Sequence, residues 1–119
     1  MSRLIPLLLF GLAAAVVLAT SPLDPAAAAP HVYTVEFENE KVRVLKRTVR
    51  PGETIPLIAQ PDRVVVYVNQ CAWMDQDDDG NKYMESYEFG SPVWAPAETH
   101  GGKTSNVIQT CHIVEVELK

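Results

Sequence analysis

The chain has 119 residues and a formal net charge of −5 at pH 7. An acidic chain repels the phosphate backbone of nucleic acid, and no basic run offsets the repulsion, so we expect no nucleic-acid partner. The length allows one small domain with a modest hydrophobic core.

The first 28 residues have the pattern of an export signal. Arg3 supplies a positive charge and residues 4–18 are almost entirely apolar. Ala26 and Ala28 provide small residues at the −3 and −1 positions of a cleavage site. We therefore predict a cleaved signal peptide at 1–28 and a periplasmic or secreted protein.

The mature domain would span 29–119, with no membrane span left after cleavage. One alternative is a membrane anchor, but the apolar run is shorter than the ~20 residues that a span requires. Another is cleavage after Ala19 or Ser21. The Pro-containing segment 22–30 is predicted to be a flexible lead-in, part of which is removed with the signal.

Beyond the signal, turn residues divide the chain into short segments. No window has a helical period, and Val64–Val68 is the most strongly β-branched segment, which predicts a central strand. Pro56 places its segment at a sheet edge or bulge. Strands are predicted at 32–38, 41–49, 55–58, 64–68, 82–89, 93–95 and 107–118. Short strands in such number predict an all-β sandwich or barrel.

The last predicted strand alternates between two kinds of side chain. His112, Val114, Val116 and Leu118 share one face. We expect this face to point into the core, with His112 as a hydrogen-bonded core histidine rather than a ligand. His31, by contrast, lies near the predicted mature N-terminus and is expected to be solvated.

Two cysteines, Cys71 and Cys111, remain after the signal. In an exported chain they predict one disulfide, which would stabilise so small a domain by ~4 kcal/mol in the chain-entropy model. The alternative is a pair of free buried thiols.

A predicted hairpin tip is similar to the opening of a calcium-binding loop, because acidic residues alternate before a glycine. The candidate oxygen ligands are Asp75, Asp77, Asp79 and Asn81. Ser86 stands where a complete loop requires a glutamate, and Glu85 comes one residue early. The alternatives are a weak, structural Ca²⁺ site and a solvated hairpin tip that uses Asp-Gly turn chemistry.

Several segments resemble, in their order and spacing, those of the cupin superfamily. They are Glu38–Leu45, Pro51–Glu53, Pro61–Val66, Trp94–His100 and Val114–Lys119. The resemblance runs from about Tyr33 to Lys119 and implies a small jelly-roll barrel of two antiparallel sheets. It also implies that 64–70 lies antiparallel to the last strand with Val64 opposite Leu118, a register that sets Cys71 opposite Cys111.

The resemblance implies a metal site that has lost most of its ligands. Cupins that bind a transition metal use two histidines two residues apart, a downstream glutamate and a second-motif histidine. In this sequence the paired positions are Ile58 and Gln60, and His100 alone matches. One imidazole is not a metal site, so His100 is a weak candidate ligand and a bound transition metal is not expected.

The barrel interior is the default ligand pocket. Gln60 and His100 are its candidate polar groups, and Tyr67 and Trp94 its candidate walls. A second set of aromatic residues could line the pocket or fill the core: Trp73, Tyr83 and Tyr87.

Three functions remain open. The sequence favours a non-enzymatic module that binds an unidentified small molecule or protein. The alternative is a small metal-dependent enzyme, of the dioxygenase or isomerase type, in which Gln60, Asp62 or Glu98 joins His100. A third is a structural subunit that forms a homodimer through edge strands such as 32–37. No motif for a serine or cysteine nucleophile or for a phosphate-binding loop is present.

Overall fold

The computed structural model describes residues 23–119, and most of the predicted signal peptide, 1–22, lies outside the described residues. Within 23–119 the elements are strands apart from one helical turn, α2 (Pro25–Ala28), which confirms the all-β prediction. The strands are β1 (Tyr33–Glu38), β2 (Val42–Val49), β3 (Thr54–Ile55), β4 (Ile58–Gln60), β5 (Arg63–Tyr67), β6 (Cys71–Gln76), β7 (Lys82–Tyr87), β8 (Pro92–Ala95), β9 (Glu98–His100), β10 (Lys103–Thr104) and β11 (Cys111–Leu118).

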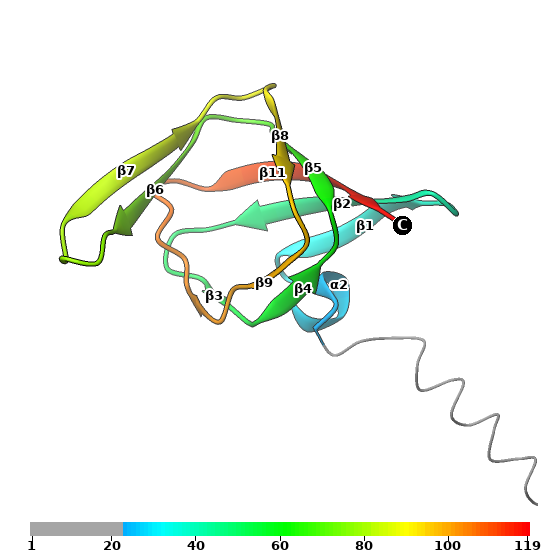
Figure 1. Cartoon of the computed structure of the whole chain (residues 1–119), viewed down its shortest axis with the longest axis horizontal. Helices are drawn as coiled ribbons and strands as arrows, with labels where there is room; N and C mark the ends of the chain where they lie inside the picture. The colour runs from blue at the N-terminus through cyan, green and yellow to red at the C-terminus, as the bar shows by residue number, and fades with distance from the viewer. Residues whose placement is uncertain (1–22) are drawn as a thin grey trace, which may run out of the picture.

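The strands form one large sheet and three small pairs, all antiparallel. The large sheet is five-stranded with the order β1-β2-β11-β5-β8. The pairs β10-β3, β4-β9 and β6-β7 form the other wall, and the β6-β7 hairpin extends from one end of the barrel (Figure 1). Because β11 lies between β2 and β5, the end of the chain completes the centre of the sheet, as in a jelly roll.

Proline and glycine explain where the strands differ from the predicted boundaries. The segment predicted as one strand at 55–58 splits into β3 and β4 around Pro56, which donates no backbone hydrogen bond. The short strand β10, which follows His100, was not among the predicted strands. The hairpin turn at 77–81 is confirmed by the pairing of β6 with β7, although β6 itself was not predicted.

The prediction for the last strand was wrong about its faces. Cys111, Ile113, Glu115 and Glu117 of β11 are buried, whereas His112 is exposed. The apolar residues that alternate with the glutamates therefore face outward. The predicted alternation with a period of two is confirmed, but the face of this sheet that points into the barrel carries charged side chains.

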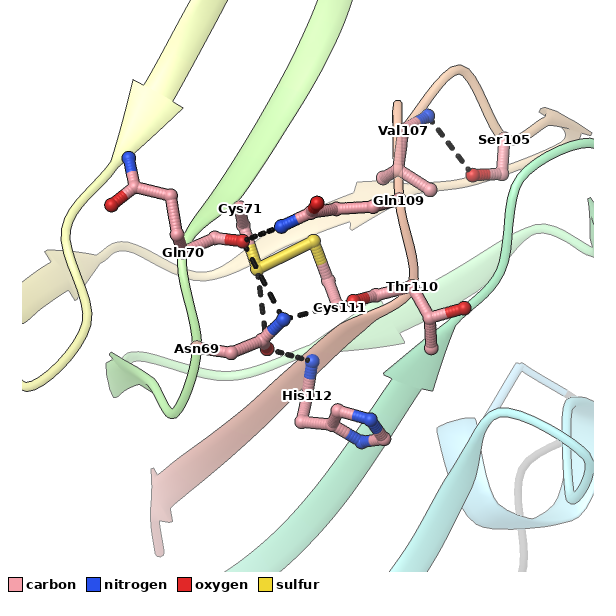
Figure 2. The surroundings of a disulfide bond; sticks show 9 residues. All are labelled: Asn69, Gln70, Cys71, Ser105, Val107, Gln109, Thr110, Cys111 and His112. Carbon is pink, nitrogen blue, oxygen red and sulfur yellow. Dashed lines mark hydrogen bonds between the residues drawn. A yellow bond between two sulfur atoms is a disulfide. The ribbon is translucent and has the colours of Figure 1, made fainter.

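The disulfide between Cys71 and Cys111 is confirmed (Figure 2). The implied register was wrong by two residues, because Val64 pairs with Val116 rather than with Leu118. Cys71 reaches its partner because the chain leaves β5 and turns before β6. Asn69 holds this turn, since its side chain donates to the Thr110 carbonyl at 2.9 Å and accepts from the His112 N–H at 2.7 Å (Figure 2).

Residues 23–30 belong to the packed domain rather than to a flexible lead-in. Asp24 caps α2 by accepting a hydrogen bond from the Ala27 N–H at 3.3 Å. Pro25 and Ala29 are fully buried. The Leu23 carbonyl accepts from the Ala59 N–H at 2.8 Å, which ties this segment to β4. Cleavage after Ala28 stays a prediction, and it would separate α2 from the barrel.

The apolar core lies between the large sheet and the small pairs. It includes buried residues from most strands: Val32, Tyr33, Leu45, Val49, Ile55, Ile58, Val65, Tyr67, Cys71, Val107, Cys111 and Ile113. Among residues 23–119 there is no helix of the length and hydropathy that crossing a bilayer would require.

Replacing both cysteines by serine should lower the free energy of unfolding by about 4 kcal/mol, because the bridge closes a loop with a sequence separation of 40. Urea unfolding followed by tryptophan fluorescence measures the loss. Reduction of the wild-type protein should give the same result. A loss of less than about 1 kcal/mol would show that the bridge adds little to the fold.

Candidate functional site

The inner face of the large sheet carries charged side chains, which seldom occupy a protein interior unless they are paired. Arg43 and Arg47 of β2, Arg63 of β5, and Glu115 and Glu117 of β11 all point inward, because each alternates with an outward-facing residue. Their side chains are at most 16% exposed. The interior is therefore built around an ionic network.

Glu115 is the centre of this network and is fully buried. Its Oε1 accepts hydrogen bonds from Arg63 Nε at 2.8 Å and from Gln60 Nε2 at 3.1 Å. Its Oε2 lies 3.5 Å from Arg47 Nη1. Taking a carboxylate out of water costs several kcal/mol, and the two guanidinium groups offset this cost. Removal of either guanidinium group would leave the buried Glu115 charge only partly compensated.

A second cluster connects the sheet to the N-terminal turn. Arg43 donates to Glu117 Oε1 at 2.8 Å and to Asp24 Oδ1 at 2.7 Å. Gln60 joins the two clusters, because its amide nitrogen donates to Glu117 Oε2 at 2.9 Å as well as to Glu115. Burial alone would lower the pKa of Arg43, but the hydrogen bonds to Asp24 and Glu117 raise it above its ordinary value.

Arg63 links the network to β9. Its Nη2 donates to Glu98 Oε2 at 2.8 Å, while its Nε donates to Glu115. Burial acts to lower the pKa of Arg63, yet the hydrogen bond to Glu98 and the charge of Glu115 raise it overall. Arg63 is therefore a fixed positive charge with both of its carboxylate partners in place.

Gln60 determines the tautomer of His100. Both N–H groups of its amide nitrogen are donated to carboxylates, so its Oε1 is directed at His100 Nε2, 2.7 Å away. An amide oxygen can only accept a hydrogen bond. The network therefore assigns the proton of the neutral ring to Nε2 and leaves Nδ1 with a free lone pair.

His100 is held as a neutral acceptor. Burial of its ring lowers its pKa below the usual value of 6.5, and the charges of Arg47 and Arg63 lower it further. Among the described residues, no hydrogen-bond donor reaches Nδ1, and this atom is not one of the buried polar atoms that lack a partner. Since His100 lines the cavity described below, Nδ1 is available to a molecule bound there.

Gly101 allows the chain to turn directly after His100. His100 pairs with Ile58 across β9 and β4, and the chain then reverses toward β10. Gly101 has a φ of 91°, and a Cβ at this position would collide with the Pro56 carbonyl oxygen. A residue with a side chain would therefore displace the strand end that carries the imidazole.

A cavity of about 410 Å³ lies beside the ionic network. This volume is within the ~300–1,000 Å³ range of small-molecule sites. One wall is polar and contains Arg47, Arg63, Glu98 and His100. Further residues that line the cavity are Val49, Ile55, Tyr67, Trp73, Asp75, Glu85, Tyr87, Gly101, Lys103, Ser105 and Asn106.

Three aromatic rings form a second wall. Tyr67 and Tyr87 are stacked with their centroids 4.7 Å apart, and Trp73 packs edge-on against both rings. Burial raises the pKa of Tyr67 to about 12, so its hydroxyl stays protonated at physiological pH. The Tyr87 hydroxyl donates to Glu85 Oε2 at 3.2 Å. These rings give the cavity an aromatic, largely apolar side.

The four residues predicted to form the pocket are only partly brought together. Tyr67 and His100 line the cavity, and Gln60 lies behind His100 as its hydrogen-bond partner. Trp94 is a correction. It pairs with Val64, shares the outward face of the large sheet and is 55% exposed, so it is not a wall of the cavity.

The acidic hairpin tip is organised by backbone hydrogen bonds. Asp77 Oδ1 accepts from the N–H groups of Asp79 and Asn81, at 3.0 and 2.8 Å. Those bonds, chiefly the one from the Asn81 N–H, lower the pKa of Asp77. Asp75 lies apart from the tip, because it lines the cavity and accepts from Asn106 Nδ2 at 3.0 Å. The proposed calcium ligands therefore occupy two different environments.

The donor set does not fit a transition metal. His100 Nε2 is hydrogen-bonded to Gln60, and Ile58, which has no donor atom, is fully buried across from it. Glu98 is paired with Arg63, and Asp62 accepts from the Ala97 N–H. Within residues 23–119, no group of three or more His, Cys, Asp or Glu side chains could hold a metal ion.

Sequence reasoning missed Arg47, Arg63 and Glu115, which shape the polar side of the site. A signal was present, because charged residues recur at every second or fourth position of two predicted strands: Arg43 and Arg47, then Glu115 and Glu117. Opposite charges on neighbouring strands with the same period indicate paired interior charges as well as a solvated face.

Comparison with known proteins identifies the fold. A cupin domain from Bordetella pertussis Tohama I is 24% identical, with a TM-score of 0.52 over 74% of this chain and 92% of that chain. A cupin superfamily protein from Desulfitobacterium hafniense DCB-2 is 12% identical, with a TM-score of 0.48 over 73% and 75%. No family model and no curated protein matches the sequence. The chain has the cupin fold, as the sequence segments implied.

The free energy of unfolding should fall as the pH is lowered from about 7.5 to about 5.5, in part through His100. The unfolded chain binds a proton at His100 near its ordinary pKa of 6.5, whereas the folded state binds it only at lower pH. The unfolded state thus holds more protons in this window, so stability rises with pH. Urea unfolding across the window measures the slope.

In that series, His100→Asn should have a shallower slope than the wild type. The matched control is His112→Asn, at an exposed position. The change in its free energy of unfolding between the two ends of the pH range should equal that of the wild type. An unchanged slope in His100→Asn would mean that the ring is not held neutral by the fold.

Proposed function

We propose that the protein is an exported, cupin-fold binding module whose barrel interior binds a small organic molecule. The observation that carries this proposal is the 410 Å³ cavity with one preorganised polar wall and one aromatic wall. The polar wall needs no rearrangement to bind, because Gln60 and the ionic network already fix His100. Preorganisation of this kind reduces the entropic cost of binding.

The charges that line the cavity favour an uncharged polar or zwitterionic ligand. Three cations, Arg47, Arg63 and Lys103, are balanced by three carboxylates, Asp75, Glu85 and Glu98. A cavity lined by equal numbers of positive and negative side chains discriminates little between ligands of different net charge. Recognition would therefore depend on hydrogen bonds and on contact with the aromatic rings. We expect a ligand with a flat apolar part for the aromatic rings and a hydrogen-bond donor for His100 Nδ1.

A metal-independent role is part of the proposal. The side chains that a metal would need beside His100 are engaged elsewhere: Gln60 binds two glutamates, and Glu98 binds Arg63. The metal-dependent enzyme, the alternative from sequence, would require Gln60, Asp62 or Glu98 to leave its present partner and join His100. The Asp75–Asn81 segment is proposed to act as a hairpin turn rather than as a calcium site, because Asp77 caps the turn.

Export to the periplasm or the exterior is supported by the disulfide, since disulfides persist in oxidising compartments. The predicted signal peptide is consistent with this location.

The test is ligand binding by the protein expressed from the full chain and recovered after export. Native mass spectrometry would identify a co-purifying molecule, and thermal shifts would be measured with small aromatic alcohols, amines and amino acids. We expect at least one compound to raise Tm in the wild type but not in Ser105→Phe, which fills the cavity. Ser91→Phe, at an exposed turn outside the cavity, is the matched control.

Equal shifts in the Ser105 and Ser91 variants would place binding outside the cavity and contradict the proposal. Metal analysis of the same samples addresses the alternative. Stoichiometric iron, manganese, nickel, zinc or copper that is lost in His100→Ala would favour the metal-dependent enzyme instead.

A further inference from the structure

The charged side chains that line the cavity are balanced in number but not in their pairing. Each of the two arginines is already ion-paired with a glutamate of the network, at 2.8 and 3.5 Å. Among the described residues, Asp75, Glu85 and Lys103 form no ion pair. The lining therefore has two unpaired carboxylates and one unpaired lysine, so its unpaired charge is negative.

The two unpaired carboxylates lie on the same face of the β6-β7 hairpin. Trp73 pairs with Glu85, and Asp75 pairs with Tyr83, so Asp75 and Glu85 are diagonal neighbours across the two strands. Both line the cavity. Diagonal neighbours on one face of an antiparallel pair are ~7–8 Å apart. A single cationic group between them can therefore contact both carboxylates.

This end of the cavity is rich in hydrogen-bond acceptors. Asp75 accepts from Asn106 through Oδ1, and Glu85 accepts from Tyr87 through Oε2, so each carboxylate keeps one oxygen without a partner in the described structure. Asn106 makes its contact through the amide nitrogen, which leaves its Oδ1 as a further acceptor. Such a lining fits a ligand group that is rich in donors. A primary ammonium group has three N–H donors and no acceptor.

The hydroxyl group of Tyr67 independently indicates a ligand at this place. Tyr67 is only 9% exposed and lines the cavity. Among the described residues its hydroxyl has no hydrogen-bond partner, yet it is not one of the enclosed polar atoms that lack one, so it is open to the cavity. Its ring is stacked on that of Tyr87, whose hydroxyl binds Glu85. The Tyr67 oxygen can therefore accept a third hydrogen bond beside the carboxylates.

The negative charge of the two carboxylates acts on the aromatic side of the cavity. Burial raises the pKa of Tyr87, and the charge of Glu85, the hydrogen bond to it and the charge of Asp75 raise this pKa further. Carboxylates that disfavour a phenolate anion at this place favour a cation there.

We propose that the cavity binds small molecules through a primary ammonium group, which lies between Asp75 and Glu85 while the hydrocarbon part contacts the aromatic rings. This inference rests on the proposed function and narrows its ligand class. An amine with a pKa near the ~10.4 of lysine is protonated at pH 7. Its hydrogen bonds to the carboxylates are charge-assisted, which makes them stronger than those of a neutral hydroxyl group.

Isothermal titration calorimetry at pH 7 tests the preference for an ammonium group, with the protein expressed from the full chain and recovered after export. The probes are 2-phenylethylamine and phenylalanine. Each is compared with the analogue in which a hydroxyl replaces the ammonium group, namely 2-phenylethanol and 3-phenyllactate. We expect at least one ammonium compound to bind at least about tenfold more tightly than its hydroxyl analogue.

Substitutions assign this preference to the two carboxylates. Glu85→Gln removes the charge but keeps an oxygen for the Tyr87 hydroxyl, and it should reduce the preference to less than about threefold. Asp75→Asn, which can still accept from Asn106, should act in the same direction. Glu88→Gln is the matched control, because it removes one negative charge at an exposed position outside the cavity, and it should keep the wild-type preference. Circular dichroism must show that each variant is folded.

The inference is overturned if neither ammonium compound binds the wild type, or if the hydroxyl analogues bind as tightly. A preference that survives in both folded variants, or that falls equally in Glu88→Gln, would also overturn it. A neutral ligand that Ser105→Phe excludes would leave the proposed function intact and contradict this inference alone. Binding of the ammonium compounds that Ser105→Phe does not affect would contradict both.

Discussion

The pairing of Glu115 with Arg63 and Arg47 is the interaction on which the rest of the structure depends. Glu115 is fully buried in the central strand of the large sheet, so its charge must be compensated inside the barrel. Its partners come from the strands on either side, β2 and β5. The ion pairs therefore favour one register of the sheet, since a slip of β11 by one residue would turn Glu115 and Glu117 outward and away from the arginines.

The same network produces the site and the unusual surface. Glu115 fixes the side chain of Gln60 by accepting a hydrogen bond from its amide nitrogen. The Gln60 oxygen then accepts the Nε2 proton of His100, so the Nδ1 lone pair stays available to a molecule in the cavity. Because side chains alternate along each strand, the valines between these charged residues lie on the outer face of the sheet. The polar cavity and the apolar outer face therefore both follow from the orientation of the strands, with the charged side chains inward. Asp24 extends the network to the N-terminal turn through Arg43.

Much of the fold could be predicted from the sequence, because turn residues and β-branched runs act locally. The strands at 32–38, 41–49 and 64–68, the hairpin at 77–81 and the disulfide follow from such signals and from the resemblance to cupins. The orientation of β11 could not be predicted in the same way. Apolar and acidic residues alternate there with the same period in either orientation, and the choice depends on arginines from distant strands. Trp94 was misplaced for the same reason.

The candidate site was predictable only in outline. His100 and Tyr67 could be assigned to the interior from the resemblance, but the role of Gln60 depends on two glutamates more than 50 positions away. The chain has the cupin fold, and inside it Gln60, Glu115 and Glu117 bind one another. The fold supplies the cavity, but the fold alone does not name what the cavity binds.

A double-mutant cycle on Arg63 and Glu115 tests the central claim most directly. Arg63→Met and Glu115→Gln would be made singly and together, and the free energy of unfolding measured by urea. If the buried pair organises the interior, each single variant should lose about 3–5 kcal/mol, because it removes the nearest partner of the opposite buried charge and leaves only Arg47 beside Glu115, or only Glu98 beside Arg63. The double variant should lose at least about 2 kcal/mol less than the sum of the two. Losses that add to within about 0.5 kcal/mol would show that the two residues act independently and would contradict the account.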